Sequence, residues 1–233
     1  MKWLIYGATG LVLVFAIGLF FQVNTISVEG NERYTSEDIV RVSELVPGGS
    51  MFIFDKSGAE RKVKEHFPYI EDAVVKLRIP DMLTISVTES VPLARVSVGN
   101  GAYALLDRRG KILEVGEDII AGVELRGVPA IECRAGAFYE LDNDVDIEAL
   151  DYALEILNEL ALYELIEKTA FLEASALNPV FRYDRIYSVE LGARYNTAAK
   201  IRLFELCIPQ FERGVRATVI LSIPGQVNYV PMY

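Results

Sequence analysis

The sequence predicts an α+β protein in which a single N-terminal transmembrane helix precedes two mixed domains. Three observations support this prediction. Residues 3–23 contain no charged side chain, and residues 24–91 show the pattern of one strand, two helices and two strands. Residues 92–233 alternate short strands with two amphipathic helices. We therefore expect one membrane anchor followed by two folded domains.

The charge-free run has the length of a membrane span. At a rise of about 1.5 Å per residue, a helix over residues 3–23 reaches about 31 Å, which matches a hydrocarbon core of about 30 Å. Trp3 and Tyr6 lie near its start, where aromatic rings favour the headgroup layer. A cleaved secretory signal is the alternative, but this run is long for the apolar segment of such a signal. We expect a retained transmembrane helix.

Charged residues predict the orientation of the span and exclude one class of partner. Residues 1–2 form a short stub that carries Lys2, and the first basic residue after the span is Arg33. Because positive charge favours the cytoplasmic side, we expect the N-terminus inside the cell and residues 24–233 outside the cytoplasm. A net charge of −10 repels phosphate backbones, so we expect no nucleic acid as a partner.

The first domain is expected to be a three-stranded sheet with two helices packed on one face. Thr35 starts the first helix, with Asp38 three residues on in the spacing of a capping box. In the last strand, side chains such as Leu83 should face the core while Thr84, Ser86 and Thr88 face water. The predicted elements are a strand around residues 26–28, helices at 35–46 and 57–66, and strands at 73–79 and 83–89.

The second domain is expected to contain short strands, two long amphipathic helices and a last extended piece. The acidic residues before the first of these helices, Asp144 or Asp146, are expected to cap it. The predicted elements are strands at 93–98, 103–106, 111–114, 123–125, 171–176, 180–183, 188–191 and 216–223, helices at 147–166 and 198–213, and an extended piece at 227–233.

The sequence contains no pattern that predicts an active site. His66 is the only histidine and lies in the last turn of a predicted helix, where the helix dipole favours a protonated ring. Asp142, Asp144 and Asp146 alternate as in a calcium loop, but Ile147 stands where that loop needs glycine. We therefore expect no enzyme, no metal, no cofactor and no small-molecule substrate.

The two cysteines do not form a redox or zinc motif, because Cys133 and Cys207 are far apart in the sequence. Cys207 lies on an apolar helical face and is expected to act as a small buried hydrophobe. A disulfide between the two cysteines is the alternative outside the cytoplasm.

Several segments resemble a known family. Ile26-Ser27-Val28-Glu29-Gly30-Asn31, Tyr34-Thr35 at the start of a helix, and Val87-Thr88-Glu89-Ser90-Val91-Pro92 are similar to a POTRA domain of the type found in the bacterial cell-division protein FtsQ, named DivIB in Gram-positive bacteria. The second half resembles the β domain of this family at Asp107 to Gly110, at Leu191-Gly192, in the helix that contains Lys200 and in the strand after Gly214.

The resemblance covers essentially the whole chain in one order. It implies a transmembrane helix over residues 3–23, a POTRA domain of β-α-α-β-β order over residues 24–91, and an FtsQ-type β domain with a C-terminal edge strand over residues 92–233. The family usually has a longer cytoplasmic tail than residues 1–2, and a long tail usually follows the β domain.

The strand at 216–223 predicts a binding site for another chain. If no later strand covers it, its unpaired backbone groups allow a partner to add a strand. The alternative is that residues 227–233 fold back and block this edge. The resemblance implies that membrane-anchored coiled-coil proteins of the FtsB/DivIC and FtsL type dock near this edge. The predicted partner-binding residues are Thr218, Val219, Ile220, Leu221, Ser222, Ile223, Val227 and Tyr229.

The function implied by the resemblance is that of a non-enzymatic, single-pass scaffold in the cell membrane, concentrated at the division septum. It would recruit septal division proteins by β-augmentation at its C-terminal sheet edge. The alternative is a POTRA-containing envelope-assembly or secretion accessory protein. That class needs a downstream barrel, whose alternating strands of about ten residues are not found in this sequence.

Overall fold

The computed structural model describes residues 22–50, 54–212, 214–223 and 225–232. Two compact units meet in the sequence between Ser90 and Val91. The predicted span, residues 3–23, lies outside the described residues except for Gln22 and Val23. Within the described part of the chain, no helix combines the length and the apolar character that a membrane crossing needs.

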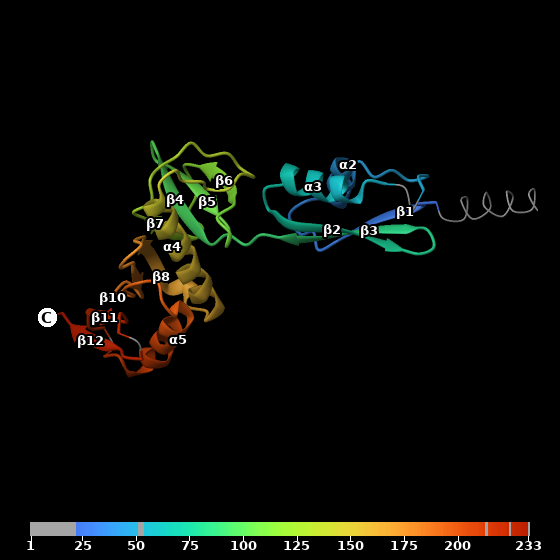
Figure 1. The fold of residues 1–233 in the computed structure, drawn as a ribbon. Helices are drawn as coiled ribbons and strands as arrows, with labels where there is room; N and C mark the ends of the chain where they lie inside the picture. The colour runs from blue at the N-terminus through green and yellow to red at the C-terminus, as the bar shows by residue number, and fades with distance from the viewer. Residues whose placement is uncertain (1–21, 51–53, 213, 224, 233) are drawn as a thin grey trace, which may run out of the picture. The chain divides into compact units, whose positions relative to one another are not determined.

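The first unit has the predicted order of one strand, two helices and two strands (Figure 1). Its three-stranded sheet runs in the order β1-β3-β2, with β1 parallel and β2 antiparallel to the central β3. Its elements are β1 (Thr25–Glu29), α2 (Ser36–Ser43), α3 (Lys56–His66), β2 (Ile70–Arg78) and β3 (Met82–Glu89).

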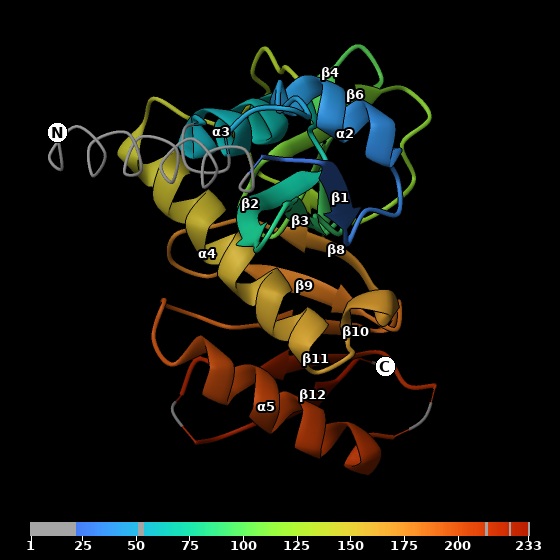
Figure 2. The same cartoon turned by 90° about the vertical axis from the view of Figure 1, so that its right-hand side faces the viewer.

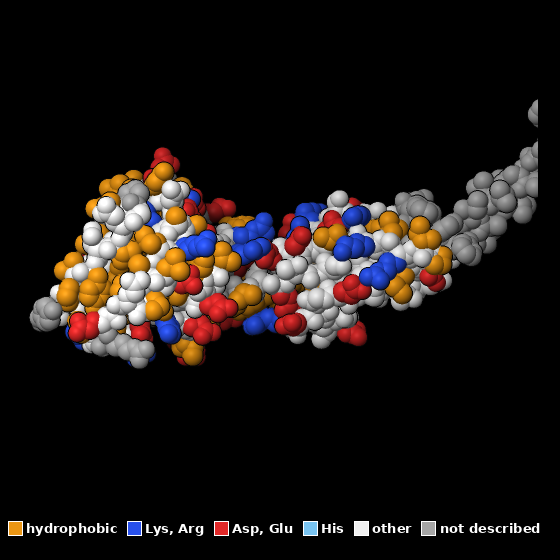
Figure 3. All heavy atoms as spheres, turned by 90° about the horizontal axis from the view of Figure 1, so that it is seen from below, with side chains coloured by type: hydrophobic (Ala, Val, Ile, Leu, Met, Phe, Trp, Pro, Cys, Tyr) orange, Lys and Arg blue, Asp and Glu red, His pale blue; other side chains and the backbone are white. Residues whose placement is uncertain are grey.

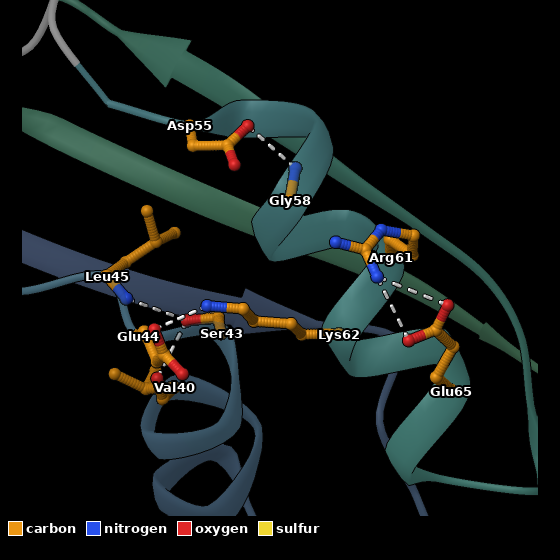
Figure 4. A network of polar contacts seen from close by, with 9 residues as sticks. All are labelled: Val40, Ser43, Glu44, Leu45, Asp55, Gly58, Arg61, Lys62 and Glu65. Carbon is orange, nitrogen blue, oxygen red and sulfur yellow. Dashed lines mark hydrogen bonds and ion pairs between the residues drawn. The ribbon is translucent and has the colours of Figure 1, made fainter.

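Side-chain caps start both helices of this unit. The hydroxyl of Thr35 accepts a hydrogen bond from the Asp38 N–H at 3.2 Å, which confirms the predicted cap of α2. Asp55 does the same for α3 by accepting from the Gly58 N–H at 2.8 Å (Figure 4). The helices and the sheet bury one apolar core between them, which includes Val23 at 2% exposure.

The prediction that Thr84 faces water was wrong. Ser86 and Thr88 of the same strand are half-buried and exposed, but Thr84 is fully buried. The reason is the position of β3 in the centre of the sheet, where both neighbouring strands cover it. The Thr84 hydroxyl lies 3.0 Å from the Ser27 hydroxyl on β1, so the buried polar group has a hydrogen-bond partner.

The second unit is built on a sheet of nine strands in the order β12-β11-β10-β9-β8-β7-β4-β5-β6. Its strands are β4 (Ala94–Gly99), β5 (Ala102–Leu106), β6 (Ile112–Gly116), β7 (Val123–Arg126), β8 (Thr169–Glu173), β9 (Val180–Tyr183), β10 (Tyr187–Glu190), β11 (Ala217–Ile220) and β12 (Asn228–Pro231). The helices α4 (Asp144–Leu162) and α5 (Thr197–Cys207) lie in front of these strands in Figure 2 and share one core with them.

Two helix boundaries differ from the prediction for local reasons. The cap of α4 is Asn143, whose side chain accepts from the Val145 N–H at 2.9 Å, so Asp144 and Asp146 lie in the first turn instead of at the cap. The second helix ends at Cys207 and passes into a 3-10 turn, Ile208–Gln210. Pro209 in that turn has no N–H and cannot continue the helix.

Both cysteines are free thiols, so the structure contains no disulfide between them. Cys133 and Cys207 are each half-buried, and Cys207 is therefore more accessible than expected for a core residue. Burial raises the pKa of the Cys133 thiol above its ordinary value.

Candidate partner interface at the C-terminal sheet edge

The free edge of the nine-stranded sheet at the C-terminal end is β12 and not β11. β12 runs antiparallel to β11, and Val219 lies opposite Tyr229. On its other side, β11 pairs in parallel with β10. The expectation of an open strand at residues 216–223 was therefore wrong, and its alternative is what the structure shows. Residues 228–231 fold back, cover β11 and themselves become the edge.

The predicted partner-binding residues occupy different environments. Val219 and Leu221 belong to the core, at 0% and 1% exposure. On the other face of β11, Thr218 and Ile220 are half-buried. The connection to β12 contains Ser222 and Ile223, which are exposed, and Val227, which is half-buried. Only Tyr229 lies on the edge strand itself. The structure thus brings these residues together in β11, β12 and the connection between them but presents few of them to a partner.

Among the described residues, no strand pairs with the outer side of β12, so its backbone groups on that side can bind a partner. The Met232 N–H donates to the Arg216 carbonyl at 2.7 Å. In an antiparallel pair of strands, hydrogen-bonded pairs alternate with pairs that are not hydrogen-bonded. The hydrogen-bonded pairs of β11 and β12 are therefore Val230 with Thr218 and Asn228 with Ile220. The N–H and C=O of Tyr229 therefore point away from β11, towards the open side. Pro231 is the next residue whose backbone points away from β11, and it has a carbonyl but no N–H.

Aromatic side chains fix β12 to the core. The ring of Tyr229 stacks on Phe211, with ring centroids 5.1 Å apart and an interplanar angle of 26°. Its centroid lies 6.5 Å from that of Tyr187, and Phe211 lies 6.0 Å from the fully buried Phe204. A fixed edge strand loses little conformational entropy when another strand pairs with it, which favours binding.

A polar cluster supports the connection that leads to this edge. Lys200 of α5 is 7% exposed, and its ammonium donates to the carbonyls of Leu191 at 2.8 Å and Ala193 at 2.7 Å. The Tyr152 hydroxyl of α4 lies 3.1 Å from the Gly192 carbonyl and donates to it. Desolvation lowers the pKa of Lys200, while burial raises the pKa of Tyr152 to about 12.

Gly192 is held against the end of β11. Its φ of +69° is a conformation that side chains other than glycine rarely adopt. A Cβ added there would also meet the Ser222 Cβ at 2.7 Å. The two helices and residues 191–193 thus hold Ser222, the residue where the chain leaves β11 for the edge strand.

An apolar groove lies beside the connection between β11 and β12. It has a volume of about 300 Å³ and is lined from α5 by Leu203 and Leu206, and from the connection by Ile223 and Gln226. Leu206 and Ile223 are 59% and 46% exposed. Figure 3 shows that hydrophobic side chains gather on the face of the second unit that it draws. The groove can accept an apolar side chain of a bound segment.

Comparison with known proteins gives one family match. Residues 21–90 match the family model described as POTRA domain, FtsQ-type.

Three relatives illustrate how far the similarity extends along the chain. The cell division protein FtsQ of Syntrophotalea carbinolica is 30% identical over 148 residues, which are 60% of this chain and 48% of the relative. The cell division protein DivIB of Clostridium acetobutylicum is 23% identical, with 60% of this chain and 53% of the relative covered. The cell division protein FtsQ of Neisseria gonorrhoeae is 27% identical over 206 residues, or 88% of this chain and 76% of the relative. The chain thus spans about half the length of the first two.

Proposed function

Since the chain belongs to the FtsQ/DivIB family of bacterial cell-division proteins, we propose that it is a non-enzymatic membrane scaffold of the division machinery. Residues 3–23 form its transmembrane anchor, residues 24–91 its POTRA domain, and residues 92–233 a β domain outside the cytoplasm. The protein is concentrated at the division septum, where it recruits other division proteins.

The observation that best supports this proposal is the outer side of β12, with which no strand of the described part of the chain pairs. A partner strand pairs with it and extends the sheet, and the Tyr229 N–H and C=O are the first groups that it engages. The partners are membrane-anchored coiled-coil proteins of the FtsB/DivIC and FtsL type, because the family resemblance implies them. Backbone pairing is tolerant of sequence, so side chains must supply the specificity.

The groove between α5 and the β11–β12 connection is suited to supply this specificity. Its apolar lining from Leu206 and Ile223 lies beside the residues that lead into β12. A partner segment that pairs with β12 can therefore bury one of its apolar side chains in the groove. Burial of a side chain such as leucine contributes about 1.5–3 kcal/mol.

Two substitutions at one position test β-augmentation. Tyr229→Pro removes both the ring and the outward N–H, whereas the matched control Tyr229→Ala removes the ring and keeps the N–H. We expect the proline variant to bind the partner ectodomain at least about fivefold more weakly than the alanine variant, because one backbone hydrogen bond contributes about 1 kcal/mol. The affinities are measured by titration calorimetry after circular dichroism has shown that both variants are folded.

Equal affinities of the two variants would contradict pairing at β12. Ile120→Ala in the second unit serves as a further control, because Ile120 is 88% exposed and lies outside β12 and the groove. Its affinity should equal that of the unmodified chain.

A further inference from the structure

Two loops of the first unit are tied to the residues that follow the predicted anchor. The Val23 N–H donates to the Gly49 carbonyl at 2.9 Å, and the Gly48 N–H donates to the Val23 carbonyl at 2.7 Å. The Asn24 N–H donates to the Asp81 carbonyl at 2.8 Å. The loop after α2 and the turn between β2 and β3 therefore lie at the end of the unit where residue 22 begins, and Figure 1 shows the start of β1 beside that turn.

Large apolar side chains are exposed on both loops. Val46 is 67% exposed on the loop after α2, and Ile79 is 71% exposed at the turn between β2 and β3. Leu77, at the end of β2, is 45% exposed although it pairs with the buried Leu83. These three residues form the apolar rim of the first unit. Single exposed apolar residues are ordinary, but three at one end of a small domain indicate a contact surface.

Three charged groups near the apolar rim have partners within the unit, two in ion pairs and Asp81 in a hydrogen bond. The Asp81 carboxylate accepts from the Asn24 side-chain amide at 3.1 Å. Glu44, two residues before Val46, forms an ion pair with Lys62 of α3 (Figure 4). Arg78 pairs with Glu29 at 3.1 Å. Paired charges lose less free energy than isolated ones when they approach a medium of low dielectric constant.

We propose that the apolar rim docks on the surface of the bilayer that holds the anchor, with Val46, Leu77 and Ile79 seated at the boundary between headgroups and acyl chains. This inference rests on the proposed anchor. Gln22 bridges to Ser50 and Val23 is buried, so no spacer separates the apolar run from the folded unit. The rim is therefore held close to the lipid, and tethering makes even weak docking effective.

The attraction is apolar and not electrostatic. The chain has a net charge of −10, so an anionic membrane repels it at long range. Docking that depends on the three rim side chains should persist when salt screens surface charges. It orients the first unit on the membrane and so restricts where the rest of the chain can reach.

Tryptophan reporters in the full chain test this proposal. Trp3 is the only tryptophan, so Trp3→Phe provides a silent background. In it, Val46→Trp and Ile79→Trp place reporters on the rim, and Glu32→Trp places the control beyond the opposite end of β1, where the Glu32 N–H donates to the Glu89 carboxylate. The chains are reconstituted into phosphatidylcholine and phosphatidylglycerol vesicles that contain brominated lipids.

We expect strong quenching of both rim reporters, at a depth of about 5–10 Å as for interfacial apolar faces, and little quenching of the control. Adding Ile79→Asp to the Val46→Trp chain should abolish most of the quenching at position 46, which shows that the native rim and not the reporter drives docking. High salt should leave the quenching unchanged.

Flotation of the vesicles separates the possible failures. If the chain floats with the vesicles but the rim reporters are quenched no more than Glu32→Trp, docking is overturned and the anchor stands. If quenching disappears at high salt, apolar docking is overturned. If the chain does not float, the proposed anchor fails, and the docking that rests on it fails as well.

Discussion

At the scale of single residues, Lys200 and Gly192 show how the candidate interface is held in place. The Lys200 ammonium satisfies the carbonyls on both sides of Gly192, and Gly192 in turn lies against Ser222. A chain of direct contacts thus joins α5 to Ser222, the second residue after β11. Both residues belong to segments on which the sequence resembles the FtsQ/DivIB family, and the structure gives a physical reason for them.

Replacement of Lys200 by methionine should destabilise the second unit by about 3 kcal/mol, because one buried and one part-buried carbonyl lose a charged donor while the volume of the side chain is kept. The matched control is Arg202→Met, which removes a positive charge from an exposed position of the same helix and should change stability little. Urea unfolding measures both. Similar unfolding midpoints for the two variants would show that the contacts of Lys200 contribute little.

At the scale of elements, the edge strand of the sheet is β12, whereas the sequence alone predicts that the strand at residues 216–223 is the edge. Both strands are short, with the sequences Ala-Thr-Val-Ile and Asn-Tyr-Val-Pro, and their residue types alone do not show that β12 pairs with β11. The pairing of Val219 with Tyr229 makes the difference. The eight residues predicted for partner binding therefore include two core residues, and the backbone groups of Tyr229 are the ones directed away from β11.

Acidic substitutions in β11 should report on folding and not on partner binding. Val219→Glu places a carboxylate in the core at a position with 0% exposure, and we expect a loss of about 4 kcal/mol or more. Thr218→Glu, on the half-buried opposite face of the same strand, is the control and should cost far less. The measurement is again the urea midpoint. A stable Val219→Glu chain would mean that β11 is not packed as described.

The first unit shows what pattern recognition achieves for elements. Its order of one strand, two helices and two strands was predicted, and so was the cap at Thr35. The burial of Thr84 could not be predicted, because alternation along a strand does not reveal that both of its sides are covered by neighbouring strands.

In the second unit, the predicted cap of α4 was wrong by one residue, since Asn143 and Asp144 are both good capping types.

At the scale of the whole molecule, two units follow an apolar run in one chain of 233 residues with a net charge of −10. The FtsQ-type POTRA match covers residues 21–90, and the similarity to the Neisseria relative extends over 88% of the chain. The proposed scaffold function belongs to this scale, because it needs the anchor, the first unit and the edge strand in the same molecule.

Depletion of the protein in its native bacterium should block septation and produce long filaments in which DNA replication continues. Phase-contrast microscopy with a DNA stain and a membrane stain measures cell length and septum frequency. Expression of the unmodified chain should restore septa, and the Tyr229→Ala chain should restore more of them than the Tyr229→Pro chain. Normal septation after depletion would remove the basis for the division assignment.

The sequence by itself determined the α+β class and the order of the helices and strands, and it contains the segments that resemble the FtsQ/DivIB family. The class and the order depend on periodicity, caps and turn residues, which act between neighbours along the chain. Only the tertiary structure decided that β12 and not β11 forms the edge, that Thr84 is buried, and that Val46, Leu77 and Ile79 meet at one end of the first unit. Those features arise from contacts between residues remote in sequence, so they depend on the tertiary packing of each unit.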